Sequence, residues 1–566
     1  MQNSLEQIWA NTIIDQLIYE GHSYFCISPG SRSTPLVLAI AHHPKASSYV
    51  YHDERALGYH ALGHAMASKK APVIVVTSGT ACGNLLPAIM EARASHIPLI
   101  IITADRPYEL QDCGANQTTK QTSLFNDFVV KTFPLPTPDP FILEKTLRSL
   151  IHESSYLSRK HQLPVHINTP FREPFDIFND DYPLQKSQLL FSPIYEMSIP
   201  PEDLKQIASL LKEKKGLIIL GKNAFTPSEF ESFKQLKNHL CYLIYNDPLS
   251  GYPYDNQNFL SFVMRMVHED PPEEFCFDLV LHFGESFVSK SLGQCLLKSP
   301  PKFYIQIQPY EKKFDPYHLI THKVETKPEL FCKLVLSYLE KNEDQVRNEF
   351  ADIKPILNNT IEQYKKSEPY LFWHLNLLNT REFDLYLGNS MPIRDFQDFF
   401  HAQQPFNRIF CNRGLSGIDG NIATCCGIVK QTNNPLLAII GDQTFFHDLS
   451  SLAQIKNLEA PLLLIVINNG GGRIFSHLPI GKNMKICQDY FINHSICSPS
   501  EIGRCFGIDS YLFDDPDSFF HKAHSLIKLN RSILLEVLTD PAQNTLIYEQ
   551  LNELCLDALY ANARKP

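Results

Sequence analysis

Two short apolar runs near residue 450 constrain the fold most strongly. Residues 436–440, Leu-Leu-Ala-Ile-Ile, and residues 461–467 are typical of buried strands of a parallel sheet. Residues 443–458 between them are long enough for the crossover helix that joins two parallel strands. The segment therefore predicts an α/β unit in which both strands end at the same edge of one sheet.

Polar residues follow both predicted strands. Gly441-Asp442 comes after the first, and Asn469, followed by Gly470–Gly472, comes after the second. Open α/β sheets bind ligands at this edge. A carboxylate, an amide oxygen and a bare backbone carbonyl suit Mg²⁺, which completes its coordination with water and with phosphate oxygens of a ligand. The alternative at each position is structural, because Asp often caps a helix and Asn-Gly-Gly often forms a turn.

The chain of 566 residues is too long for one hydrophobic core, because domains usually hold about 100–200 residues. Apolar runs alternate with helical stretches, which predicts three doubly wound α/β domains with mostly parallel sheets. We expect them at residues 1–180, 195–340 and 360–566, with a linker near 172–201 and a polar connection at 335–366. The strands predicted in the first two domains are 24–27, 73–77, 99–103, 216–221, 241–245, 278–283 and 303–307.

Composition and charge narrow the classes of partner. The chain has 44% hydrophobic and 20% charged residues, and its net charge of −10 argues against nucleic acid or an anionic membrane as the main partner. No apolar run approaches the roughly 20 residues of a membrane span, and the N-terminus lacks the basic and apolar segments of a signal peptide. We expect a cytoplasmic protein with no nucleic-acid or membrane partner.

Four arginines lie at or just beyond predicted strand ends. Arg32 stands in a loop of small residues, 28–35, that opens a helix, where free N–H groups also attract anions. Arg106, Arg394 and Arg413 follow later strands. Because each arginine can bind a carboxylate bidentately, the set indicates a substrate with more than one carboxylate. Any one of them is more often a surface ion pair, and the loop alone can be a plain strand-to-helix turn.

Glu54 precedes a predicted helix rich in small residues, from Ala56 to Ala67. Small residues at this density allow another helix to approach closely, as at a tight subunit or domain contact. In such an interface burial would raise the pKa of Glu54 and favour proton sharing with a ligand nitrogen. The alternative is an acidic first turn that the helix dipole favours.

Together these residues resemble the thiamine-diphosphate-dependent 2-oxoacid enzymes. The spacing from Gly441-Asp442 to Asn468-Asn469 is similar to that of the whole superfamily. Other segments more closely resemble its menaquinone-pathway synthases, and these are residues 28–35, 105–107, 113–117, 412–420 and 468–475. In the middle domain only Ser289-Lys290 looks like a family motif.

The resemblance implies a thiamine-diphosphate-enzyme fold, with a pyrimidine-binding-type first domain, a central domain and a diphosphate-binding-type third domain. It implies decarboxylation of 2-oxoglutarate and addition of the succinyl carbanion to isochorismate, which is a transferase reaction. The implied cofactors are thiamine diphosphate and Mg²⁺, with Mn²⁺ as the alternative metal. The implied assembly is a homodimer or a dimer of dimers, because each site is shared between subunits.

The resemblance also assigns roles to residues. Asp442, Asn469 and the carbonyl of Gly471 would hold the metal, Glu54 from a partner subunit would bind the aminopyrimidine ring, and Ile418 would bend the cofactor. The other implied cofactor contacts are Ser390, Gly417, Gly441, Gln443, Ile474 and Phe475. The implied substrate contacts are Ser31, Arg32, Arg106, Asn116, Gln117, Lys290, Arg394 and Arg413. The implied catalytic residues are Glu54, Arg32, Arg394 and Arg413.

Two positions depart from the family pattern. Leu415 is larger than the Ala or Gly usual at its position, and Gln443 stands where many superfamily members have Gly. Neither change removes a ligand, although either can alter affinity or rate.

Three rival functions remain open. Another thiamine enzyme, such as a pyruvate decarboxylase or an acetolactate synthase, is disfavoured because pyruvate has a single carboxylate and would not need four arginines. A non-catalytic cofactor-binding homologue is disfavoured because Asp442, Asn469 and Glu54 are all present. A Mg²⁺-dependent nucleotide-binding protein is disfavoured because the chain has no G-x-x-x-x-G-K-S/T loop.

Overall fold

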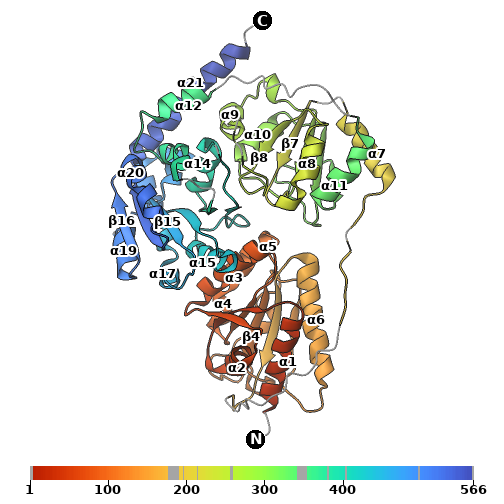
Figure 1. The fold of residues 1–566 in the computed structure, drawn as a ribbon. Helices are drawn as coiled ribbons and strands as arrows, with labels where there is room; N and C mark the ends of the chain where they lie inside the picture. Colours follow the sequence, from red (N-terminus) through yellow and green to blue (C-terminus); the bar gives the residue numbers. More distant parts are fainter. Residues whose placement is uncertain are drawn as a thin grey trace.

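The computed structural model contains three parallel sheets, one after another along the chain (Figure 1). It describes residues 4–175, 190–195, 197–212, 215–254, 256, 259–340, 353–378, 382–401, 404–494 and 497–563. Every strand pairing in these residues is parallel, which confirms the predicted α/β class. Parts of both predicted connections, residues 176–189, 196 and 341–352, lie outside the described residues, as does position 180, where we expected the first domain to end.

The first sheet has the strand order β2-β1-β3-β4-β6-β5. Its strands are β1 (Tyr24–Ser28), β2 (Ser47–Val50), β3 (Val73–Val76), β4 (Ile100–Asp105), β5 (Thr132–Pro134) and β6 (Val165–Pro170). Alternate strand residues face two different cores, as a sheet covered on both faces requires. Helices α1 (Leu5–Tyr19), α2 (Thr34–His42) and α6 (Glu144–His161) cover one face, and α3 (Glu54–Ser68), α4 (Thr80–Asn84) and α5 (Leu86–Ala94) cover the other.

The second sheet has the order β11-β10-β9-β7-β8. Its strands are β7 (Gly216–Leu220), β8 (Leu243–Asn246), β9 (Leu279–Phe283), β10 (Phe303–Gln308) and β11 (His322–Glu325). Helices α7 (Pro201–Leu211), α8 (Phe230–Lys237) and α11 (Pro328–Val335) pack on one face. On the other face, α9 (Leu260–Val267) and α10 (Lys290–Lys298) belong to a core that continues into the third domain.

The third sheet has the order β13-β12-β14-β15-β17-β16. Its strands are β12 (Asp384–Leu387), β13 (Ile409–Phe410), β14 (Leu436–Gly441), β15 (Leu462–Asn468), β16 (Asp509–Phe513) and β17 (Ile533–Leu538). The core shared with the second domain includes α12 (Lys354–Ile361), α13 (Glu368–Trp373), α14 (Met391–Phe399), α20 (Pro516–Ile527) and α21 (Pro541–Ala563). Helices α15 (Asn421–Thr432), α17 (Leu452–Ile455) and α19 (Pro499–Cys505) pack on the opposite face.

The crossover predicted as one helix over residues 443–458 is broken into shorter pieces. The chain forms α16 (Asp442–Phe446), the 3-10 helix η9 (Leu449–Ser451) and α17. The break falls at Asp448, which is fully buried and accepts hydrogen bonds from Ala423 N at 3.0 Å and Ser451 Oγ at 2.6 Å. This tertiary contact with α15 competes with a continuous helix, so the prediction of one helix was wrong.

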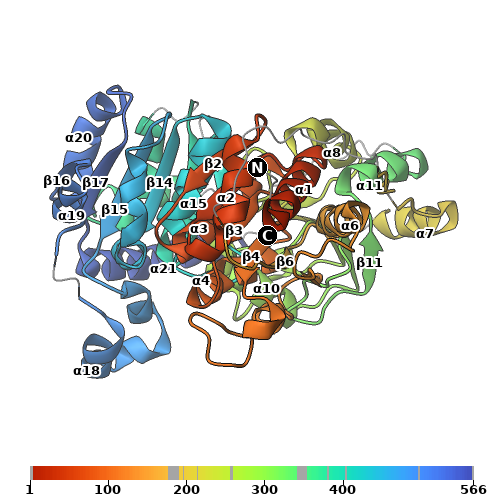
Figure 2. The ribbon, with the colours of Figure 1, turned by 90° about the horizontal axis from the view of Figure 1, so that it is seen from below.

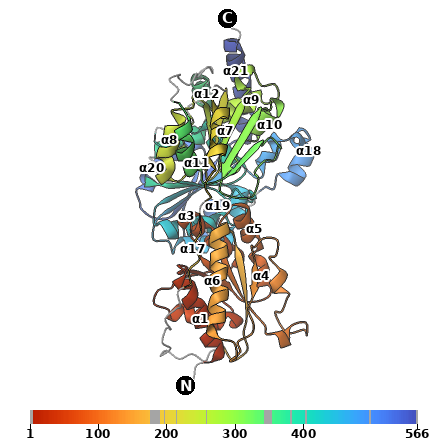
Figure 3. The same cartoon turned by 90° about the vertical axis from the view of Figure 1, so that its right-hand side faces the viewer.

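Helices α3 and α15 join the first and third domains (Figure 1), and Figure 3 shows α3 where these two domains meet. A Cβ on Gly63 would lie 2.1 Å from the carbonyl oxygen of Thr424, and a Cβ on Gly427 would lie 2.0 Å from that of His60. The two backbones therefore approach too closely for any side chain at either glycine. The predicted close helix contact exists, and within one chain it is a contact between domains.

The excursion after β15 stands apart from the sheets. Residues 473–491, with the short helix α18 (Met484–Ile486), extend away from the third sheet (Figure 2). No helix within the described residues is long and apolar enough to cross a membrane.

We predict that Gly63→Ala destabilises the protein by about 1–3 kcal/mol, the usual cost of overpacking a tight core. The added methyl group would meet backbone rather than a side chain that can move. Chemical denaturation measures the change. Gly83→Ala in α4 is the matched control, because a Cβ there meets nothing within 4 Å and alanine favours a helix. An equal free energy of unfolding for both variants would contradict the close crossing.

Candidate active site

The third sheet places Asp442, which follows β14, beside the segment that follows β15 and holds Asn469. Strands β14 and β15 pair with Gly441 opposite Ile467, so they end at adjacent register positions. Asp442 Oδ1 accepts a hydrogen bond from Gln443 N at 2.7 Å, and Oδ2 accepts one from Gly471 N at 2.8 Å. Burial raises the pKa of Asp442 to about 6, although both backbone hydrogen bonds oppose the shift. The carboxylate is thereby fixed across the gap between the two strand ends.

The side chain of Asn469 is oriented by a buried acid. Asn469 Nδ2 donates to Glu368 Oε1 at 2.8 Å, and Glu368 also accepts from Asn544 Nδ2 at 2.9 Å. Burial raises the pKa of Glu368. Asn469 Oδ1 is buried and has no hydrogen-bond partner among the described residues. A buried acceptor left without a donor is costly, so this oxygen fits a cation.

The backbone completes a set of oxygens. Gly471 adopts φ +124°, and a Cβ there would lie 2.8 Å from the carbonyl oxygen of Asn493, so only glycine fits. Its own carbonyl accepts from Arg473 N at 2.8 Å and keeps a second lone pair. In the described part of the chain no three His, Cys, Asp or Glu side chains form a metal cluster. One carboxylate with amide and backbone oxygens fits Mg²⁺ bound to a phosphorylated ligand.

A cavity of about 270 Å³ opens beside these oxygens. The predicted cofactor residues that line it are Ser390, Ile418, Gly441, Asp442, Gln443, Asn469, Gly471, Ile474 and Phe475. Its other lining residues were not predicted, namely Glu368, Asn389, Met391, Pro392, Thr444, Ile467, Gly472, Arg473 and Phe491. All of these residues belong to the third domain. Glu368 carries no local signal, because it lies 101 residues before the asparagine that it orients.

Glu54 is not among the residues that line this cavity. It begins α3, is half-buried, and accepts a hydrogen bond from Asn84 Nδ2 at 3.3 Å. The preceding Asp53 accepts from Ser450 Oγ at 2.7 Å, which holds the start of α3 against the third domain of the same chain. The single chain therefore leaves Glu54 less enclosed than we expected.

Arg32 and Arg106 form one cationic pair, at the edge of the first sheet. Arg32 Nη1 donates to the Phe171 carbonyl at 2.9 Å, and Nη2 lies 3.3 Å from Glu173 Oε1. Arg106 is buried and donates to Ser78 Oγ. Burial lowers the pKa of Arg32, and repulsion from Arg106 lowers it further. Two arginines placed close together where strands of the first sheet end favour an anionic ligand.

Arg394 and Arg413 form a second pair in the third domain. Burial lowers the pKa of Arg394, and the charge of Arg413 lowers it further. Arg413 Nη1 donates to Asn389 Oδ1 at 3.2 Å and to Ser416 Oγ at 2.9 Å. Asn389 itself lines the cavity, so this pair adjoins it. Gly417 lies outside the lining, and its carbonyl accepts from Asn389 Nδ2 at 2.8 Å.

The remaining predicted substrate residues lie outside the cavity lining. Ser31, Asn116 and Gln117 are exposed in the first domain, and Gln117 Nε2 donates to the Ser78 carbonyl at 2.8 Å. Lys290 is exposed at the start of α10. The single chain thus divides the predicted substrate residues among the three domains and does not gather them into one site.

Comparison with known proteins covers almost the whole chain. Residues 9–125 match the N-terminal TPP binding domain of thiamine pyrophosphate enzymes, residues 196–387 match the middle domain, and residues 392–537 match the C-terminal TPP binding domain. The 2-succinyl-5-enolpyruvyl-6-hydroxy-3-cyclohexene-1-carboxylate synthase of Chlorobium phaeovibrioides is 32% identical over 567 residues, covering 97% of each chain. The chain belongs to this synthase family. The synthase of the same name from Psychromonas ingrahamii is 34% identical, covering 96% of each chain.

Solved structures show the same fold as this synthase-family chain at low sequence identity. A putative thiamin diphosphate-dependent enzyme from Mycobacterium smegmatis has a TM-score of 0.72 at 15% identity, covering 95% of this chain and 100% of that one. Benzoylformate decarboxylase from Polynucleobacter necessarius has a TM-score of 0.73 at 13% identity, with coverage of 96% and 99%. These structures show that the chain has the thiamine-enzyme fold. The two matched TPP binding domains show that thiamine diphosphate is its cofactor.

The departure from the synthase-family pattern at residue 415 and the departure from the superfamily pattern at residue 443 differ in their surroundings. The side chain of Leu415 is 54% exposed and does not line the cavity. Gln443 lines the cavity and exchanges hydrogen bonds with Asn493: its Nε2 donates to the Asn493 carbonyl at 2.9 Å, and Asn493 Nδ2 donates to Gln443 Oε1 at 3.3 Å. Gln443 thereby ties the edge of the sheet to the chain just after the excursion of residues 473–491.

Proposed function

We propose that the chain decarboxylates 2-oxoglutarate and adds the remaining succinyl unit to isochorismate. The products are 2-succinyl-5-enolpyruvyl-6-hydroxy-3-cyclohexene-1-carboxylate and CO₂, in menaquinone biosynthesis. The observation that carries this proposal is similarity over 97% of the chain to a synthase named for that product. The oxygen set at Asp442 and Asn469 independently supports the cofactor part of this proposal, since it fits a metal that holds a diphosphate.

The third domain would bind the cofactor. Asp442, Asn469 Oδ1 and the Gly471 carbonyl would hold Mg²⁺, or Mn²⁺, against the diphosphate. When bound, thiamine diphosphate supplies the electron sink for loss of CO₂ from a 2-oxoacid. Ile418 would set its bent shape, and the apolar walls would exclude water. The other cofactor contacts would be Ser390, Gly417, Gly441, Gln443, Ile474 and Phe475.

Glu54 would act in the cavity of a second copy, holding a proton at the aminopyrimidine nitrogen. Both carboxylates that line the cavity are engaged elsewhere: Glu368 binds two asparagine side chains, and Asp442 binds two backbone N–H groups. The acid must therefore come from outside the lining, and hydrogen bonds hold the start of α3 to its own third domain. A homodimer, or a dimer of dimers, would complete each site.

The arginines would bind the substrates. 2-Oxoglutarate and isochorismate each carry two carboxylates, and two separate arginine pairs suit two dicarboxylates. Arg394 and Arg413 adjoin the cavity of their own chain, whereas Arg32 and Arg106 would come from the first domain of the second copy. The other substrate contacts would be Ser31, Asn116, Gln117 and Lys290.

The product assay tests this function directly. We expect the purified protein with thiamine diphosphate and Mg²⁺ to release CO₂ and form the adduct from 2-oxoglutarate plus isochorismate. Omitting the cofactor, or removing the metal with a chelator, should abolish turnover. Pyruvate in place of 2-oxoglutarate is the control substrate. Turnover of pyruvate alone would favour another thiamine decarboxylase, and no turnover of either acid would favour a non-catalytic homologue.

We predict that Asn469→Ala weakens Mg²⁺-dependent binding of thiamine diphosphate by at least about tenfold. Changes to residues that only support a metal ligand commonly cost about 10-fold or more in metal affinity, so loss of a ligand should cost at least that. Isothermal titration without substrate measures the affinity. Asn457→Ala is the matched control, because Asn457 Nδ2 donates to Gln454 Oε1 at 3.3 Å and the residue does not line the cavity. Equal affinities would remove Asn469 from the metal site.

Complementation tests whether Glu54 serves another copy. Glu54→Gln and Asp442→Asn should each lose activity by about 100-fold or more, because one removes a proton-sharing acid and the other a charged ligand. Co-expressed, the two variants should form mixed dimers with one intact site, restoring about a quarter of wild-type activity if subunits pair at random. Asp442→Asn with Asn469→Ala is the control pair and should restore nothing. Failure of the first mixture to recover would place both residues in the same chain's site.

A further inference from the structure

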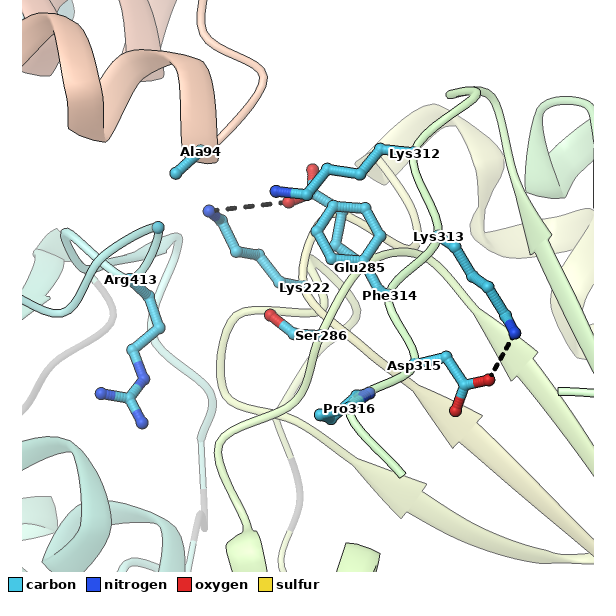
Figure 4. A pocket seen from close by; sticks show the side chains of 11 residues that line it. Ala94, Lys222, Glu285, Ser286, Lys312, Lys313, Phe314, Asp315, Pro316 and Arg413 are labelled. Carbon is cyan, nitrogen blue, oxygen red and sulfur yellow. Dashed lines mark ion pairs between the residues drawn. The ribbon is translucent and has the colours of Figure 1, made fainter. Parts of the chain in front are cut away.

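The three domains meet around a cavity of about 390 Å³ near Arg413 and Gly414 (Figure 4). Lys222 and Glu285, from the ends of β7 and β9, line it from the second domain. Next to Lys222 is Ser95, the C-cap residue of α5, and Glu91 lies four residues earlier in the same helix. These four polar side chains are almost fully buried, with exposed fractions of 6% for Lys222, 1% for Glu285, 3% for Glu91 and 2% for Ser95.

The four side chains form one line of polar contacts between domains. Lys222 Nζ lies 3.7 Å from Glu285 Oε2 and donates to Ser95 Oγ at 2.7 Å. Ser95 Oγ in turn donates to Glu91 Oε1 at 2.8 Å. Burial alone would raise the pKa of Glu285, but Lys222 and then His96 outweigh it, so the pKa lies below its ordinary value. Each polar group in the line therefore has a complementary neighbour.

Glu91 then reaches the third domain. Its Oε1 accepts from Gly414 N at 2.6 Å, and its Oε2 accepts from Leu415 N at 2.7 Å. One buried carboxylate thus binds two successive backbone N–H groups. A Cβ on Gly414 would lie 2.5 Å from Ser95 Oγ and 2.8 Å from Glu91 Oε1. Because residue 414 is glycine, the loop of residues 412–417 can come this close to Glu91 and Ser95 of α5.

The same loop is held from its other side by Asn389. Asn389 Nδ2 donates to the carbonyls of Asn412 and Gly417 at 2.6 and 2.8 Å, and its Oδ1 accepts from Arg413. The loop therefore lies between Glu91 of the first domain and Asn389 of the third. Its position fixes where Arg413 and Ile418 stand relative to the cavity that Asn389 and Ile418 line.

We propose that Glu91 is a positioning residue for the active site of its own chain. By binding the N–H groups of residues 414 and 415, it sets the part of the loop that carries Arg413, while Asn389 holds the Gly417 end beside Ile418. Ser95 and Lys222 connect Glu91 to the second domain. The arrangement of the three domains therefore determines where Arg413 lies. The inference rests on the proposed function only where it assigns Arg413 to a substrate carboxylate.

Glu91→Gln tests the proposal, because glutamine keeps the size but replaces one acceptor oxygen with an NH₂ that faces a backbone N–H. We expect the amides of residues 412–417 to exchange hydrogen about 10-fold faster, since local opening becomes easier. The KM for 2-oxoglutarate or for isochorismate should rise about 10-fold, the size of effect expected when a charge-assisted hydrogen bond is lost. The kcat and the half-saturating concentration of thiamine diphosphate should each change by less than about threefold. This split separates misplaced substrate binding from general destabilisation.

Two further variants make the result decisive. Glu153→Gln on α6 is the matched control, because Glu153 forms an exposed ion pair with Lys131, and it should behave as wild type. Ser95→Ala removes the link to Lys222 but keeps the Glu91 carboxylate. It should therefore raise amide hydrogen exchange in residues 412–417 by a smaller factor than Glu91→Gln. This variant also tests the proposal if Glu91→Gln does not fold. Wild-type exchange and wild-type KM values in Glu91→Gln would overturn the proposal. A wild-type protein that forms no product would overturn the proposed function, and the exchange measurements would still test Glu91.

Discussion

The parallel register of β14 and β15 is the constraint on which the cofactor site depends. Leu437 and Ile439 of β14 face the core shared with the second domain, while Ala438 and Ile440 face the opposite core. A slip by one residue would exchange the two faces, so packing on both sides fixes the register. With Gly441 held opposite Ile467, Asp442 meets the backbone of Gly471. Packing on the two faces of the sheet thus decides where the oxygens proposed to hold the metal lie.

Sequence alone predicted the parts of the fold that have strong local signals. Nine buried apolar strands were predicted, because their side chains are apolar on both faces; they are β1, β3, β4, β7, β8, β9, β10, β14 and β15. The equally buried strands β6 and β17 were not predicted. The edge strands β5, β11 and β16 were not predicted, because none of them is a continuous buried apolar run. The single crossover helix failed at Asp448, whose carboxylate caps the N-terminal part of α15. A contact between segments distant in sequence leaves no local pattern.

The residues of the candidate site likewise fall into those that the sequence predicted and those that it could not predict. The rule that ligands bind where parallel strands end identified Asp442 and Asn469, and both line the cavity. It could not identify Glu368, which reaches Asn469 from a helix that precedes the first strand of the sheet. Nor could it show that the four arginines form two pairs, one in the first domain and one in the third, because each pairing depends on how segments distant in sequence come together within a domain.

The first domain has two surfaces that meet the rest of the chain, and they have different consequences. At α5, Glu91 contacts the loop at residues 414–415 and steadies a site in the same chain. At α3, the hydrogen bonds of Asp53 and Arg55 to residues 447–450 hold the helix start beside its own third domain, while Glu54 stays outside that domain's cavity. Under the proposed function, the tight crossing of α3 and α15 therefore directs Glu54 to another copy. Assembly and loop placement then both depend on how closely the first and third domains pack.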